Sequence, residues 1–263
     1  MVTDLDYDNG AAVAGSERYG AIWTKAAAAF RDALGSRARL GLPYGPAPRE
    51  RADLFLPECS TEGLVIYIHG GYWRSRDRDD WSHFAEGSLA RGQAVAMPSY
   101  TLAPQITLTT MAERLAAAVE MLAGEVPDVP IRLVGHSAGG HMVARLIAEG
   151  SALPDVVLAR ITHVMSISPI SDLTPLLGLA LNDDLRLTPE EAQAESPLFL
   201  NKRSKTLVSV WVGADELPAF VDQARWLAGA WDAPLHEVAG RHHFDIIDAL
   251  RDAESDMVRT LLD

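Results

Sequence analysis

The chain has 263 residues, of which 48% are hydrophobic and 22% charged, as is typical of a soluble globular protein. Its net charge of −13 at pH 7 argues against nucleic acid or an anionic membrane as a partner, since both bind basic patches. The single cysteine, Cys59, excludes an internal disulfide bond and fits a reducing compartment.

The first ten residues, MVTDLDYDNG, are acidic and lack the basic start and the apolar centre of a signal peptide. No apolar run approaches the roughly 18 residues that indicate a membrane span. We therefore expect a cytoplasmic protein. The sequence does not fix the oligomeric state, and a homodimer is compatible with it.

The predicted elements begin with a helix over 16–34, for which Ser16 is the expected N-cap and Gly35 the stop. A loop rich in Pro and Gly over 41–48 and a short strand over 51–56 follow. Apolar runs of strand length then alternate with helical stretches. The expected strands are 64–68, 93–97, 131–134, 161–167, 207–212 and 235–238, and the expected helices are 79–91, 109–123, 139–149, 219–231 and 244–262.

This alternation predicts an α/β fold in one domain over 1–263, with a mostly parallel central sheet and helices on both faces. Segment 169–200 interrupts the alternation, and its Thr188-Pro189 pair is typical of a helix start. We expect a small helical insertion there, either a cap or a longer crossover. Ligands of such sheets bind at the carboxyl ends of the strands, so the loops after the apolar runs should carry the chemistry.

A candidate nucleophile follows the strand at 131–134. The next residues read Gly135-His136-Ser137-Ala138-Gly139, and a helix is expected directly afterwards. A G-x-S-x-G motif between a strand and a helix is typical of the nucleophile elbow of α/β-hydrolases. The serine lies on a strained turn, so the residues two positions away must be small, and the helix N-terminus favours developing negative charge. Ser137 is the candidate nucleophile; a glycine-rich turn that only caps a helix is the alternative.

A serine hydroxyl needs a base to accept its proton, and in this fold an acid and then a histidine follow the serine along the chain. Asp215 stands just past the strand at 207–212 and is the favoured acid, with Glu216 as its rival. An Asp215 that only caps the next helix is the alternative. The base is His242 or His243. No cysteine or carboxylate spacing supports a metal site at these histidines, and no motif implies a cofactor.

A second motif, His69-Gly70-Gly71-Tyr72-Trp73, follows the strand at 64–68. Acyl transfer creates an oxyanion that backbone N–H groups stabilise. In this fold one donor comes from the residue after the nucleophile, here Ala138, and another from a glycine-rich loop, here Gly70 and Gly71. Tyr72 and Trp73 are expected to shape the substrate pocket, with core packing beneath the loop as the alternative. His69 is expected to orient the turn.

Several segments together resemble the kynurenine formamidase (arylformamidase) branch of the α/β-hydrolases, which is related to hormone-sensitive-lipase-type esterases. They are HGGYW, Ser99-Tyr100-Thr101-Leu102-Ala103-Pro104, GHSAGGH, GADE and HHFDII, and the resemblance extends from Pro43 to the last helix. It implies that Ser137 is the nucleophile, Asp215 the acid and His243 the base. It also implies an oxyanion hole formed by Gly70, Gly71 and Ala138. The chain departs from the family at Ser168-Pro169, where the family often has Ser-Gly.

These features predict a serine hydrolase that acts on a small acyl compound without a cofactor. The favoured substrate is an N-formyl arylamine such as N-formylkynurenine, whose aryl group would stack on Tyr72 or Trp73. A short-chain carboxylesterase or thioesterase with the same triad is the runner-up. A binding protein that has the fold but no turnover is the third hypothesis.

Overall fold

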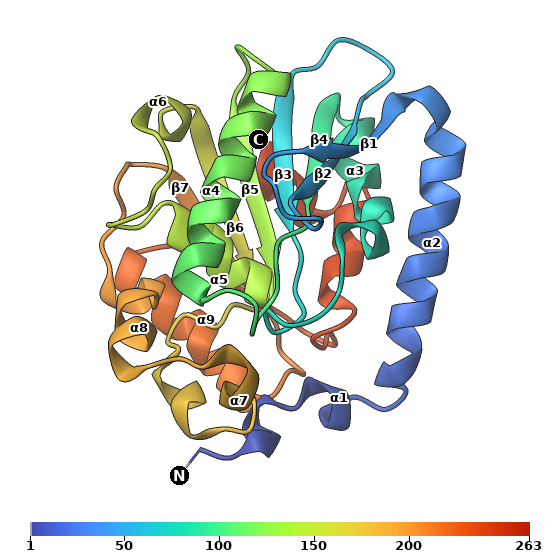
Figure 1. Cartoon of the computed structure of the whole chain (residues 1–263). Coiled ribbons are helices and arrows are strands. Elements are labelled where there is room, and N and C mark those ends of the chain that lie inside the picture. The colour runs from blue at the N-terminus through green and yellow to red at the C-terminus, as the bar shows by residue number, and fades with distance from the viewer. Residues whose placement is uncertain (1) are drawn as a thin grey trace.

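The computed structural model describes residues 2–263 and is built around an eight-stranded sheet (Figure 1). The strand order is β1-β2-β4-β3-β5-β6-β7-β8, and only the pairs β1–β2 and β2–β4 are antiparallel. The predicted mostly parallel sheet is therefore confirmed. The strands are β1 Ala38–Pro43, β2 Arg51–Phe55, β3 Gly63–Ile68, β4 Gln93–Pro98, β5 Ile131–His136, β6 Ile161–Ile167, β7 Leu207–Gly213 and β8 Leu235–Val238.

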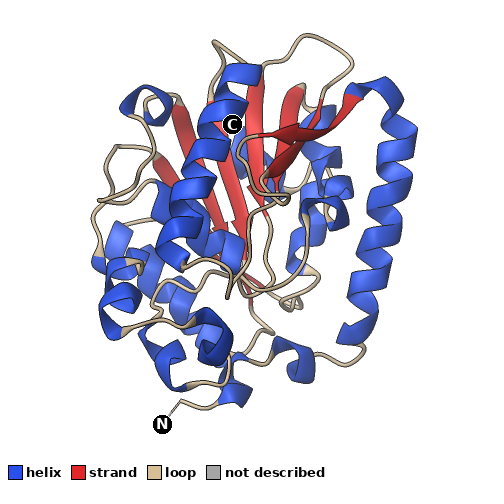
Figure 2. Ribbon diagram, in the orientation of Figure 1, coloured by secondary structure: helices blue, strands red, loops and turns tan. Residues whose placement is uncertain are grey.

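Helices cover both faces of this sheet (Figure 2). One face packs against α4, α5 and α9, and the other packs against α2, α10 and the 3₁₀ helix Ile246–Arg251. The α-helices are α1 Asn9–Ala12, α2 Tyr19–Leu34, α3 Glu86–Ala90, α4 Leu108–Glu125, α5 Ala138–Leu146, α6 Asp155–Leu158, α7 Asn182–Leu185, α8 Pro189–Ala194, α9 Pro218–Trp231 and α10 Asp256–Leu262.

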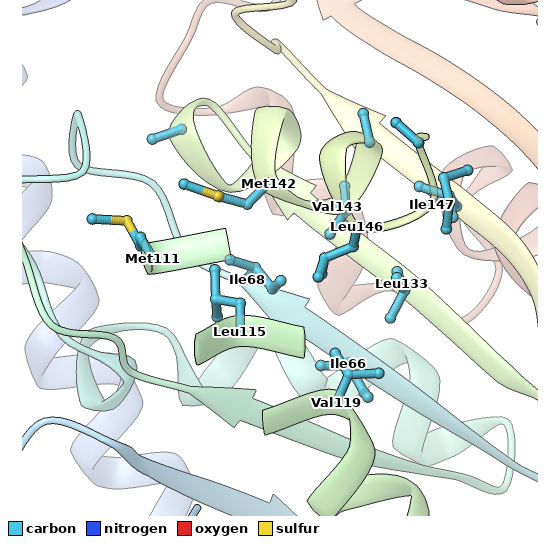
Figure 3. Packing of buried hydrophobic residues seen from close by; sticks show 14 of the residues in the cluster. Ile66, Ile68, Met111, Leu115, Val119, Leu133, Met142, Val143, Leu146 and Ile147 are labelled. Carbon is cyan, nitrogen blue, oxygen red and sulfur yellow. The ribbon is translucent and has the colours of Figure 1, made fainter. Parts of the chain in front are cut away.

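The central strand β3 illustrates how the apolar runs form two cores. Side chains alternate across a strand, so an uninterrupted apolar run supplies both faces of a covered sheet. Ile66 and Ile68 pack with Leu115 of α4 and Met142 of α5 (Figure 3). Tyr67, between them, belongs to the opposite core. All six residues of β3 are buried, which places its carboxyl end deep in the molecule.

Two predicted helices are interrupted. The segment 79–91 forms the 3₁₀ turns Arg78–Asp80 and Ser82–Ala85 before α3. The segment 244–262 forms the 3₁₀ helix Ile246–Arg251 and then α10. Asp252 is extended between the last two, and the Ser255 side chain accepts from the Val258 N–H (3.1 Å) to start α10 anew. Local capping therefore divides an apolar pattern that looks continuous in the sequence.

The N-terminal part also differs from the sequence prediction. Strand β1 begins before the predicted loop 41–48 and extends into it. Ser16 does not cap α2; its hydroxyl donates to the Gly10 carbonyl (2.6 Å), and the 3₁₀ turn Ser16–Arg18 precedes the helix. Helix α1 has no counterpart among the predicted elements. Short turns of this kind have no hydrophobic period by which to recognise them.

The expected helical insertion at 169–200 is present as α7, α8 and short 3₁₀ turns. Thr188 caps α8, and Pro189 is its first residue, as predicted. Two buried contacts fasten the insertion to α5: Arg145 Nε donates to Glu195 Oε2 (2.7 Å), and His141 Nε2 donates to the Glu195 carbonyl oxygen (2.7 Å). Within residues 2–263, no helix combines the length and the apolar character that crossing a membrane requires.

The buried His141 should make stability depend on pH. Burial lowers its pKa to about 4, against about 6.5 in an unfolded chain. The unfolded state therefore binds a proton first, so stability is full above pH 6.5 and falls as the pH drops toward 4. His141→Gln, which keeps a donor for Glu195, should reduce the loss of unfolding free energy between pH 7.5 and 5.5 by about 1.3 kcal/mol.

Urea denaturation of the wild type and His141→Gln at the two pH values measures this difference. An equal pH dependence in both proteins would mean that His141 binds a proton as readily in the folded state as in the unfolded chain.

Candidate active site

The serine of the G-x-S-x-G motif lies on a strained turn between β5 and α5. Ser137 has φ 58° and ψ −120°, a conformation that residues with a side chain rarely adopt. A Cβ on Gly135 would lie 2.1 Å from the Gly139 carbonyl oxygen. A Cβ on Gly139 would lie 1.9 Å from the carbonyl oxygen of Ile68, the last residue of β3. Both glycines are therefore steric requirements of the turn, as the motif indicates.

The second of the two neighbouring histidines contacts a buried carboxylate. His243 Nδ1 lies 2.6 Å from Glu216 Oε2, and both residues are buried. Asp215 is exposed at the end of β7, and its backbone N–H donates to the Arg241 carbonyl oxygen (3.0 Å). It does not cap α9, whose N-cap is Leu217. The prediction that Asp215 is the acidic partner is therefore wrong, because the turn after β7 directs the next side chain, Glu216, inward.

Glu216 is held by donors on both of its oxygens. Oε1 accepts from the Ser168 hydroxyl (2.5 Å) and from the Gly213 N–H (2.8 Å), while Oε2 faces His243. These hydrogen bonds offset the cost of burying a carboxylate. Ser168 is itself held in a positive-φ conformation (φ 47°), with its N–H donating to the Trp211 carbonyl oxygen (2.7 Å). In the sequence, Ser168 stands out only through the Pro169 that follows it in place of the family's usual Gly.

His242 belongs to a different network. Its Nδ1 accepts from the N–H groups of Phe244 (3.2 Å) and Asp245 (3.3 Å), so its Nε2 carries the proton that can reach the Tyr19 hydroxyl (3.3 Å). Tyr19 is the first residue of α2. His242 thus links the C-terminal loop to the N-terminal helix, while His243 faces the carboxylate.

The glycine turn after β3 passes directly beside the elbow. A Cβ on Gly70 would lie 2.9 Å from the His136 carbonyl oxygen and 3.1 Å from Ser137 Cβ. Gly71 has φ +119°, and a Cβ on it would lie 2.4 Å from the Ser75 carbonyl oxygen. His69 Nδ1 donates to the Gly70 carbonyl oxygen (2.7 Å), as expected of a residue that orients this turn. The two glycines allow the backbone to approach Ser137 closely.

The two aromatic residues after the glycines take different positions. Tyr72 is half-buried and lines the cavity in front of Ser137. Trp73 is completely buried in the core, and its ring packs edge-on against His141 (ring centroids 5.2 Å apart). The structure therefore corrects the assignment of Trp73 to the pocket and agrees with the alternative, packing beneath the loop. Tyr72 and Trp73 both have positive φ, so the backbone turns at these residues and their side chains point in different directions.

A cavity of about 160 Å³ brings the predicted residues together. Ser137, His243, Gly70, Gly71 and Tyr72 all line it, and Ala138 is buried as the first residue of α5. The structure adds further walls that the sequence analysis did not identify: Asn9, Gly10, Trp23, Ser75, Arg76, Trp81, His136 and Phe244. Four aromatic side chains thus surround a small space in front of the serine. The sequence does not indicate that these four side chains meet, because they come from separate elements of the fold.

One wall of this cavity comes from the N-terminal segment, Asp4–Ala12. Asn9 is buried and donates from Nδ2 to the Tyr72 hydroxyl (3.3 Å), which in turn donates to the Tyr7 carbonyl oxygen. The Tyr7 hydroxyl accepts from Gln223 of α9 (2.9 Å). Asp4 accepts from the Ala180 N–H of the insertion (2.8 Å). The segment therefore fastens to the glycine loop, α9 and the insertion at once.

His136, one residue before the serine, stays neutral. Burial lowers its pKa well below the usual value, and the neighbouring His243 lowers the pKa further. Its Nε2 donates to the His243 carbonyl oxygen (2.9 Å), so it supports the loop that carries His243. Across residues 2–263, no cluster of three or more histidine, cysteine or acidic side chains has an arrangement suited to a metal ion.

Comparison with known proteins agrees with this architecture. A family model described as the alpha/beta hydrolase fold matches residues 65–220. Kynurenine formamidase from Danio rerio is 29% identical over 236 residues, which are 85% of this chain and 80% of that protein. A crystal structure of a proposed thioesterase from Silicibacter sp. is 46% identical, with a TM-score of 0.96 over 99% of this chain and 98% of that chain.

Esterase B from Lactobacillus rhamnosis superposes with a TM-score of 0.69 over 93% of this chain and 94% of that one, at 20% identity, which shows a shared fold. The resemblance to kynurenine formamidases inferred from the motifs is thus confirmed at the level of sequence similarity. Since the family model covers more than half of the chain, and the parallel sheet carries a serine on the turn after β5, the chain belongs to the alpha/beta hydrolase fold family.

Proposed function

We propose that this protein hydrolyses N-formyl arylamines such as N-formylkynurenine through a Ser137–His243–Glu216 triad. The observation that carries the proposal is the buried contact between His243 and Glu216, next to a cavity that Ser137 and His243 both line. The similarity to kynurenine formamidases supports the formyl amide as the substrate class.

The proposed reaction begins when Ser137 Oγ attacks the formyl carbon and His243 Nε2 accepts its proton. Glu216 occupies Nδ1, which fixes the tautomer and stabilises the imidazolium that forms. The negative oxygen of the tetrahedral intermediate accepts from backbone N–H groups of Ala138 and of the Gly70–Gly71 turn. The arylamine then leaves with a proton from His243, and water, activated by the same histidine, releases formate and restores Ser137.

The walls of the cavity favour a small acyl group attached to an aryl leaving group. Tyr72, Trp23, Trp81 and Phe244 present aromatic surface in a cavity of about 160 Å³. Aromatic pairs in edge or offset geometry contribute about 0.5–1.5 kcal/mol beyond the burial of their area. A formyl group adds little bulk at the carbonyl, so it leaves this space to the ring of the leaving group.

A short-chain carboxylesterase or thioesterase is the second candidate. The same triad cleaves esters and thioesters, and the 46% identical structure is described as a proposed thioesterase. Such a substrate needs the same nucleophile and oxyanion donors but no aryl leaving group. The two candidates therefore differ in leaving-group preference and share their mechanism.

Substitutions of the two neighbouring acidic residues separate Glu216 from Asp215. Glu216→Gln should lower kcat/KM by about 10³- to 10⁴-fold, because the imidazole loses the carboxylate that fixes its tautomer. Asp215→Asn should change kcat/KM less than threefold, since Asp215 is exposed and does not touch the histidine. Circular dichroism of both variants checks that they fold. A large loss in Asp215→Asn with a mild effect of Glu216→Gln would reverse the assignment.

A further prediction concerns the substrate. The wild type should hydrolyse N-formylkynurenine with a higher kcat/KM than p-nitrophenyl acetate or an acetyl thioester, and Ser137→Ala should lose at least 10³-fold on each. Turnover of the ester or thioester alone would instead favour the second candidate. Unchanged hydrolysis by Ser137→Ala would rule out the triad for both.

A further inference from the structure

A cation without a protein partner lines the cavity beside the candidate nucleophile. Arg76 is exposed, and among residues 2–263 its guanidinium makes neither an ion pair nor a hydrogen bond. The neighbouring arginines are paired: Arg74 with Asp184 (2.5 Å), Arg78 with Asp53 (2.9 Å) and Arg49 with Asp77 (2.7 Å). In a chain with a net charge of −13, an arginine at the active-site cavity thus remains available for a ligand.

The surrounding backbone holds this arginine in place. Arg76 has a φ of 76°, and its carbonyl oxygen accepts from Arg49. Its side chain passes over Gly71, where an added Cβ would lie 3.0 Å from Arg76 Cγ. The guanidinium then rests over Gly20, where an added Cβ would lie 2.6 Å from one of its nitrogens. The arginine side chain thus runs across two glycines, from the glycine loop to the first turn of α2.

The charge around the guanidinium favours an anion. Gly20 is the second residue of α2, whose N-terminus carries partial positive charge. A guanidinium beside a helix N-terminus is repelled by that charge unless an anion lies between or beside them. The planar fork of arginine matches the two oxygens of a carboxylate, which it binds in bidentate geometry.

We propose that Arg76 binds a carboxylate carried by the substrate, so that this site selects acyl compounds with an anionic group beyond the reacting carbonyl. The proposal rests on Ser137 and His243 as the reacting groups and does not depend on whether the scissile bond is an amide or an ester. Arg76 acts as a specificity-determining residue: it fixes the far end of the substrate while the carbonyl lies at Ser137.

Matched esters test this role. The acetate esters of 2-, 3- and 4-hydroxybenzoate carry a carboxylate at three positions, and the corresponding hydroxybenzamide acetates replace it with a neutral group of the same shape. The wild type should prefer at least one carboxylate ester over its amide partner. Arg76→Gln should lower that kcat/KM ratio about tenfold, mainly through KM, and Arg76→Lys should retain part of it.

Arg74→Gln is the control, because Arg74 is an exposed arginine two residues away that is already paired with Asp184. It should leave the ratio unchanged. Added NaCl should weaken the carboxylate preference of the wild type, since the guanidinium is exposed to solvent. A ratio unaffected by Arg76→Gln at all three ring positions, or a wild type that prefers the neutral esters, would overturn the proposal.

The experiments distinguish a wrong formamidase assignment from a wrong role for Arg76. If N-formylkynurenine is not hydrolysed but the esters are, the formamidase assignment fails and the carboxylate ratio still tests Arg76. If no ester is turned over, binding of 3-acetamidobenzoate and 3-acetamidobenzamide, followed by tryptophan fluorescence, makes the same comparison. About tenfold weaker binding of the benzoate to Arg76→Gln, with the benzamide less affected, would support the proposal, and equal changes would overturn it.

Discussion

The close approach of α5 to the ends of β3 and β5 is the constraint on which the candidate site depends. Because Gly135 and Gly139 have no side chain, α5 can begin at Ala138, with only Ser137 between it and the end of β5. Any side chain at these positions would overlap a backbone oxygen. The same packing forces Ser137 into a positive-φ conformation and brings the Gly70 turn beside it. Strain at one residue is thus balanced by the burial of the surrounding strands.

A buried cluster of polar groups surrounds Glu216. Ser168, Gly213 and His243 together surround Glu216, and they come from the ends of β6 and β7 and from the loop before the last helices. In a parallel sheet these ends lie on one edge, so residues far apart in sequence meet there. A carboxylate buried in this way has little freedom, which is what a group that orients a base requires.

The parallel sheet and the elbow could be predicted, because each follows from a periodic pattern or a motif with a steric cause. The residues alone left His242 and His243 open as the base, and only the family resemblance favoured His243. The sequence could not decide whether Asp215 or Glu216 contacts the histidine. Adjacent residues in a turn point in different directions, and only the structure shows that Glu216 is the buried one. Trp73 looked like a pocket residue because adjacent aromatics give no sign of opposite directions. Trp23 and Trp81 could not be predicted as cavity residues, because they are far apart in the sequence and only the tertiary structure brings them together. Their ring centroids are 4.7 Å apart, and both rings line the cavity.

The wall formed by Asn9 and Gly10 has a different origin from the rest of the cavity. Ser137, Glu216 and His243 lie on the segments that follow β5, β7 and β8. The N-terminal segment contributes no strand. It is attached by the buried Tyr7, whose ring packs against Phe220 (ring centroids 5.7 Å apart), and by hydrogen bonds to Tyr72, Gln223 and Ala180. Substitutions at Asn9 and Gly10 can therefore reshape this wall without changing any strand of the sheet, which gives the fold a way to vary specificity while the candidate triad stays in place.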